Sequence, residues 1–116
     1  MKKFVGNIAA PDFVYANFAM IAEGDSMINS RILDGDVVYI RQTDNVGNGD
    51  LAAVMMEDSV VSLWRIWKYP DHIVLEKDNP KYKPLVFWDE DIEKVVVVGK
   101  ATAFTSKIKR RKEGQL

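Results

Sequence analysis

The sequence predicts a mostly β fold with little helix, in a single domain of 116 residues. Three observations lead to this prediction. Short apolar runs rich in β-branched residues recur along the chain, turn-forming pairs such as Asn48-Gly49 separate them, and helical spacing is almost absent. Runs of this kind, separated by turn residues, are typical of a compact β domain rather than of alternating strands and helices.

Several runs are predicted to be strands, because β-branched and aromatic residues dominate them. In chain order these are residues 36–41, 51–56, 59–67, 72–76, 85–88 and 95–104. The turn region 43–50 can reverse the chain, and Pro70 ends the third of these strands. Only residues 26–32 are suited to a short helical turn, with Ser26 as its N-cap.

Composition narrows the class of function. A formal net charge of −1 argues against a domain whose main role is to bind the phosphate backbone of nucleic acids. Without cysteine there is neither a disulfide nor a thiolate metal site, and the lone His72 excludes a histidine-based zinc site and a Ser-His-Asp triad. We expect Asp34 and Asp36 to be solvated turn residues, and no metal or cofactor. No apolar run suits a membrane span or a signal peptide, so we expect a cytoplasmic protein.

Charge and turn residues suggest three segments. Residues 1–11 are predicted to be the remnant of an N-terminal linker, and residues 12–105 to form the folded domain. Residues 106–116 are rich in Lys and Arg, and we expect them to be a flexible, solvated tail.

Three short motifs stand in order along the chain. Gly24-Asp25-Ser26-Met27 is followed by Asp34-Gly35-Asp36 and Asn48-Gly49-Asp50, and later by Asn-Pro-Lys-Tyr-Lys-Pro at residues 79–84. The ordered set resembles the C-terminal domain shared by LexA, the UmuD proteins and lambda-type phage repressors. The resemblance covers residues 12–105 and implies a strongly bent β-sheet assembly.

The resemblance also implies a chemistry. In that family a serine attacks a peptide bond in the protein's own linker, and a neutral lysine removes the proton of the serine. Ser26 matches the nucleophile. The backbone N–H groups of Asp25 and Ser26 match the oxyanion donors, a role that any residue type can fill.

The strand that carries the lysine departs from the family pattern. Arg65 and Ile66 match the residues that follow the lysine, so Trp64 occupies the lysine position. An indole has no basic nitrogen and only donates a hydrogen bond. Lys68 shares the face of Trp64 but lies about 13 Å further along the strand, and Arg65 points to the other face and stays protonated.

No family-type Ala-Gly or Cys-Gly scissile pair precedes Ser26. The resemblance therefore implies a regulatory and dimerisation domain of a LexA-type or phage-type transcriptional repressor, impaired in self-cleavage. It implies a homodimer formed through residues 95–104, DNA contacts made by a separate N-terminal domain, and a RecA-type co-protease of the SOS response as a partner. The alternative is an active Ser26-dependent peptidase that uses another base, so whether the chain is an enzyme stays open.

Overall fold

The computed structural model describes residues 3–6, 15–56, 60–106 and 108. Within these residues the chain forms strands and two short 3-10 helices, which confirms the prediction of a mostly β fold. The elements are β1 (Lys3–Gly6), β2 (Phe18–Ile21), η1 (Ile28–Ser30), β3 (Val37–Gln42), β4 (Leu51–Met55), β5 (Val61–Lys68), β6 (His72–Glu76), β7 (Leu85–Trp88), η2 (Asp89–Lys94) and β8 (Val96–Thr105).

The predicted strands are all present, with small differences at their ends. β6 and β7 have the predicted bounds, and β3, β4, β5 and β8 differ from them by one or two residues. β1, β2 and η2 were not predicted. Phe18-Ala19-Met20-Ile21 contains Ala and Met, which favour helices, and it becomes a strand because it pairs with β3.

The predicted helical turn at residues 26–32 is shorter in the structure. The 3-10 helix covers only Ile28–Ser30, and Arg31 ends it in the left-handed region with φ 67°. The N-cap is Met27 and makes no side-chain cap hydrogen bond, so the prediction of Ser26 as the N-cap was wrong. Residues 109–116 of the predicted tail and residues 7–11 of the predicted linker lie outside the described residues.

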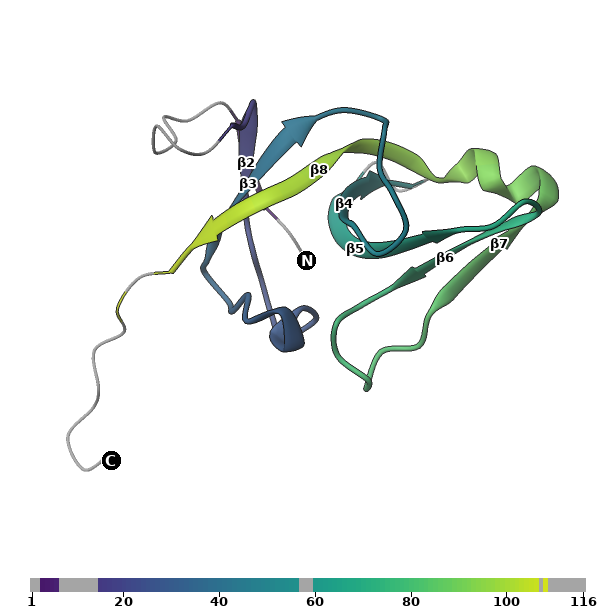
Figure 1. Cartoon of the computed structure of the whole chain (residues 1–116). Coiled ribbons are helices and arrows are strands. Elements are labelled where there is room, and N and C mark those ends of the chain that lie inside the picture. Colours follow the sequence, from purple (N-terminus) through teal and green to yellow (C-terminus); the bar gives the residue numbers. More distant parts are fainter. Residues whose placement is uncertain (1–2, 7–14, 57–59, 107, 109–116) are drawn as a thin grey trace.

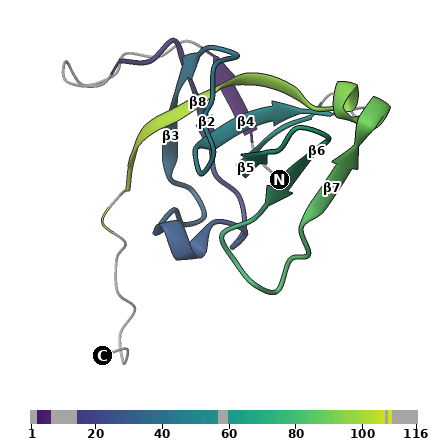
Figure 2. The ribbon, with the colours of Figure 1, turned by 45° about the vertical axis from the view of Figure 1, so that its right-hand side comes forward.

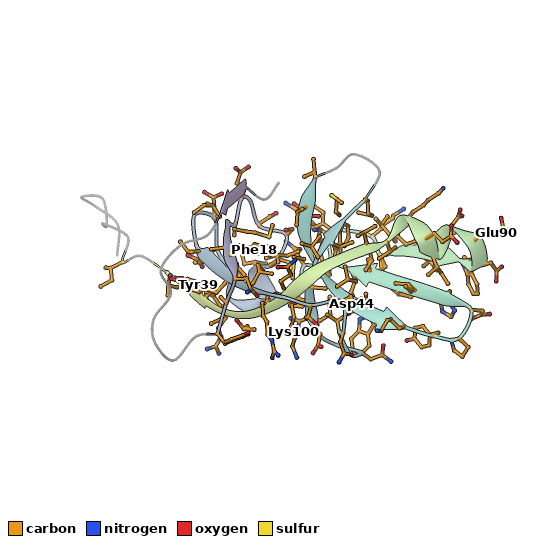
Figure 3. The ribbon with its side chains drawn as sticks, turned by 90° about the horizontal axis from the view of Figure 1, so that it is seen from above. Phe18, Tyr39, Asp44, Glu90 and Lys100 are labelled. Carbon is orange, nitrogen blue, oxygen red and sulfur yellow. The ribbon has the colours of Figure 1, made fainter. Side chains whose placement is uncertain are left out.

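The strands form one antiparallel sheet in the order β1-β2-β3-β8-β4-β5-β6-β7. β8 joins its two halves: residues 99–105 pair with β3, and residues 96–100 pair with β4. Figures 1 and 2 show β2 and β3 on one side of β8, and β4 to β7 at its other end. Phe18 and Tyr39 lie in the first half, Glu90 at the far end of the second half, and Lys100 of β8 between them (Figure 3).

Two apolar clusters lie on opposite faces of β5, because successive side chains of a strand alternate between faces. Leu63 is buried in the first cluster, with Met27 and residues of β2 and β3. Ile66 is buried in the second, with Leu75 and residues of β4. β5 is therefore covered on both sides, and the Ser26 turn lies on the face of Leu63, where Met27 anchors it.

Gly99 lies where β8 passes from β4 to β3. A Cβ placed there would approach Ile40 Cγ2 at 2.5 Å and the Arg41 carbonyl oxygen at 2.6 Å. The contact with backbone cannot be relieved by a side-chain rotation. Close approach of β3 and β8 thus requires glycine at this position.

We expect Gly99→Ala to lower the free energy of unfolding by about 1–3 kcal/mol, because the added methyl group overpacks this junction. The matched control is Gly47→Ala, whose Cβ would meet only Asp50 Oδ2, at 3.7 Å. Chemical denaturation measures both variants. Equal stability of Gly99→Ala and the unaltered protein would contradict the role of Gly99.

Candidate active site at the Ser26 turn

The turn that carries Ser26 is held between β2 and β3 by hydrogen bonds to the Asp34-Gly35-Asp36 motif. The N–H of Gly24 (φ 78°) donates to Asp34 Oδ1 at 2.8 Å. The N–H of Gly35 (φ 88°) donates to the Ala22 carbonyl oxygen at 2.7 Å. The backbone at both glycines lies in the left-handed region that glycine adopts without strain.

Asp36 belongs to the same support. It is only 2% exposed, and its Oδ2 accepts the N–H of Leu33 at 2.8 Å. Asp34 also binds a backbone N–H but is exposed, as expected, whereas the burial of Asp36 corrects the expectation that it is solvated. In the described part of the chain no three His, Cys, Asp or Glu residues form a group that could hold a metal ion.

The segment after β6 holds the other side of the Ser26 turn. Asn79 Nδ2 donates to the Asp25 carbonyl oxygen at 2.8 Å, and the N–H of Asn29 donates to the Asp78 carbonyl oxygen at 2.8 Å. In a trans peptide the C=O and N–H groups point in opposite directions. The Asn79 bond therefore sets the direction of the Ser26 N–H, one of the two expected oxyanion donors.

The side chain of Asp25 points towards the same segment. Its carboxylate forms an ion pair with Lys81 Nζ at 2.6 Å and accepts a hydrogen bond from the hydroxyl of Tyr82 at 2.6 Å. Lys81 and then Tyr82 lower the pKa of Asp25, and Asp25 in turn raises the pKa of Lys81 and of Tyr82. Asp25 and Lys81 are well exposed, so solvent screens the pair, which orients the turn more than it stabilises the fold.

Arg65 joins three elements below the turn. Its guanidinium forms an ion pair with Asp78, donates to Ser30 Oγ at 2.8 Å and donates to the Gly49 carbonyl oxygen at 3.0 Å. Ser30 Oγ also donates to Asp78. Burial alone would raise the pKa of Asp78, but the hydrogen bonds from Arg65 and Ser30 outweigh burial and lower it. The guanidinium of Arg65 thus has a structural role, because it holds these three elements together.

Trp64 and Lys77 meet on the other face of β5. The half-buried Trp64 ring packs against the second apolar cluster, and its Nε1 donates to Ser62 Oγ at 2.7 Å. Lys77 Nζ lies 3.6 Å from the centroid of the Trp64 ring and donates to the Leu63 carbonyl oxygen at 2.6 Å. No feature of the local sequence links Lys77 to Trp64, so this contact could not be predicted from the sequence.

Lys68 lies away from this contact. It is the exposed last residue of β5, where its N–H and carbonyl oxygen bond to the side chain of Asn48 at 2.5 and 3.2 Å. Gly49 has φ 87°, as its predicted turn role requires, and it packs against the ring of Trp67. The Asn48-Gly49 motif therefore holds the end of β5.

An open pocket of about 510 Å³ lies beside η1 and the segment after β6, and Ser26 does not line it. Asn29 and Ser30 line it from the turn, and Arg65, Lys77 and Asn79 line it from the other side, together with three neighbouring residues.

Comparison with known proteins agrees with this architecture. Residues 8–102 match the family described as Peptidase S24-like, so the chain belongs to that family. LexA repressors from Geobacillus kaustophilus, Moorella thermoacetica and Shouchella clausii are 40%, 37% and 33% identical over 72, 83 and 94 residues. These matches cover 62%, 72% and 81% of this chain but only 35%, 38% and 41% of the relatives. The chain thus spans well under half the length of these relatives, and the predicted resemblance to the LexA C-terminal domain is confirmed.

We expect the Arg65–Asp78 pair to make stability sensitive to acid. Because the pKa of Asp78 is lowered in the folded protein, its contribution is complete above the ordinary value of about 3.9 and is lost as pH falls through the folded value. Asp78→Asn, which binds no proton, should lose about 1.5–3 kcal/mol near neutral pH and show a weaker acid dependence.

Urea denaturation at a series of pH values measures both effects. Asp44→Asn, a change at an exposed aspartate on a loop, is the control. An acid dependence of Asp78→Asn as steep as that of the unaltered protein would contradict the role of this ion pair.

Proposed function

We propose that this chain is the regulatory and dimerisation domain of a LexA-type or phage-type transcriptional repressor, impaired in self-cleavage. The observation that carries the proposal is the Ser26 turn, which hydrogen bonds hold from both sides in a chain of the S24-like family. In this assignment Ser26 occupies the nucleophile position and Trp64 the lysine position. The N–H groups of Asp25 and Ser26 are the oxyanion donors.

Impaired cleavage follows from the chemistry of these side chains. A serine hydroxyl is a poor nucleophile unless a base accepts its proton. The Trp64 ring carries one N–H, which already donates to Ser62, and it has no lone pair that accepts a proton. The serine would be held in place with its usual activating partner missing.

Dimerisation is the activity that such a domain keeps. Linking two DNA-binding domains makes the second DNA contact intramolecular, which raises the effective concentration for paired half-sites. β8 supports this role: residues 101–105 pair with β3 but not with β4, and the side chain of Phe104 is 37% exposed. In this proposal DNA is bound by a separate N-terminal domain, a RecA-type protein is the co-protease, and the protein acts in the cytoplasm. None of the helices that the structure describes is long and apolar enough to cross a membrane.

A second candidate is an active Ser26-dependent peptidase that uses another base. Its base would have to reach Ser26, whereas the contact of Lys77 with Trp64 lies on the face of β5 opposite the Ser26 turn.

We expect Trp64→Lys to accelerate self-cleavage of the full-length protein by about 10²-fold, the usual gain from a positioned general base. Gel electrophoresis of timed incubations measures the rate, and Ser26→Ala in the same background should abolish it. If Trp64→Lys folds and cleaves no faster than the unaltered protein, Trp64 does not occupy the position of the base.

We expect light scattering to give a mass near twice 13.2 kDa at micromolar concentration. Phe104→Glu should shift the protein towards monomer, because it places a charge in the apolar contact. Val86→Glu changes a residue that is 46% exposed on β7 and serves as the control. A strict monomer at high micromolar concentration would contradict dimerisation.

A further inference from the structure

Three aromatic rings stack on the outer face of strands β6 and β7. The ring of His72 lies between those of Tyr69 and Trp88, with their centroids 4.5 and 4.2 Å away. His72 and Trp88 are paired across the strand ladder. Their neighbours Ile73 and Phe87 pack against the second apolar cluster, so the rings lie on the opposite face of the sheet. We call Tyr69, His72 and Trp88 the aromatic stack, in which Tyr69 is 47% and Trp88 is 51% exposed.

Acidic side chains border the aromatic stack. η2 begins directly after Trp88 and holds four acidic residues and one basic residue, Lys94, which pairs with Asp91 at 3.3 Å. Asp71, the residue before His72, is exposed, and its carboxylate contacts His72 Nδ1 at 2.7 Å. A partner that fits this surface combines positive charge with groups that pack on aromatic rings. Arginine does both, since a guanidinium stacks on an aromatic face.

The chain itself contains such a segment after β8. Residues 106–116 include five basic residues and one acidic residue, and all five basic residues fall within 107–112, which we call the basic segment. Two of them, Arg110 and Arg111, are arginines. Ile108, between two lysines, is fully exposed, and burial on an aromatic surface would stabilise it. The basic segment therefore matches the aromatic stack and η2 in both charge and apolar character.

The basic segment is too short to reach the aromatic stack of its own chain. β8 is ten residues long, which corresponds to about 30 Å at 3.3 Å per residue. Figure 1 shows η2 and the adjoining end of β7 beyond the start of β8, whereas the basic segment follows its last residue, Thr105. From Thr105 to Lys112 a fully extended chain spans at most about 25 Å. A second copy of the chain is not limited in this way.

We propose that the basic segment of a second copy binds to the aromatic stack and η2. This inference rests on the proposed dimerisation through β8. When residues 101–105 of two copies pair antiparallel, residue 103 lies opposite itself, and residues 109–112 of one copy come opposite residues 94–97 of the other. The basic segment of each copy then runs towards η2 of the other copy. Two equivalent contacts form around one two-fold axis and add to the contact between the strands.

Cross-linking tests this contact, because the chain has no cysteine and a single one can be introduced on each side. Glu90→Cys, on η2, and Gly114→Cys, just after the basic segment, are incubated together with a short bismaleimide, and intact mass spectrometry identifies the mixed dimer. The control pair is Gly114→Cys with Asp44→Cys, which removes the same charge at a place away from Glu90 (Figure 3). We expect the Glu90 pair to cross-link about 10-fold faster, because binding raises the effective concentration of the segment at η2.

Changes on either side of the contact should return the rate to that of the control pair. On the segment, the variant replaces all four cations at positions 109–112 by Glu. Salt at 1 M should act in the same way, because it shortens the Debye length to about 3 Å. On the sheet, Trp88→Ala in the Glu90→Cys protein removes an aromatic ring without a change of charge, and thermal unfolding checks its fold. Leu85→Ala, at an exposed residue on the other face of β7, should leave the rate unchanged.

The outcomes distinguish this inference from the proposed function. A protein with both cysteines, Glu90→Cys/Gly114→Cys, should cross-link between two chains, and an internal cross-link would overturn binding by a second copy. If light scattering gives a dimer but the Glu90 pair reacts no faster than the control pair, or the fourfold Glu variant reacts as fast as the unaltered segment, the contact is overturned and dimerisation stands. A strict monomer that forms no mixed dimer overturns both.

Discussion

The network of Arg65, Asp78 and Ser30 is the contact on which the rest of the site depends. It ties β5 to the segment after β6 and to the η1 turn, three parts of the chain that are far apart in sequence. A half-buried guanidinium offers several donors in fixed directions and stays charged, so it can hold a carboxylate, a hydroxyl and a backbone carbonyl together. Asp78 and Asn79 are then in place to bond to the Ser26 turn.

The two faces of β5 have different roles, because successive side chains of a strand point to opposite faces. Arg65 supports the Ser26 turn on one face, and Trp64 meets Lys77 on the other. A change at residue 64 therefore leaves in place the network that holds the Ser26 turn.

Local patterns predicted the parts of the fold that depend on neighbours in sequence. β-branched runs indicated β3 to β8, and the glycines at 35 and 49 have the positive φ that their turns required. The first strands were missed because β2 owes its conformation to pairing with β3 rather than to its own residues. Ser26 was singled out because its motif is contiguous, whereas Lys77 has no local feature that marks it.

The sequence by itself determined the class of fold, the family and the turn that carries Ser26, because runs, turn residues and motifs of adjacent residues encode them. Only the tertiary structure decided which side chains surround that turn. Strand register places Arg65 opposite Glu76, at the end of β6, and long-range hydrogen bonds bring Asn79 to Asp25. Register results from pairing between distant segments, so no local pattern contains it.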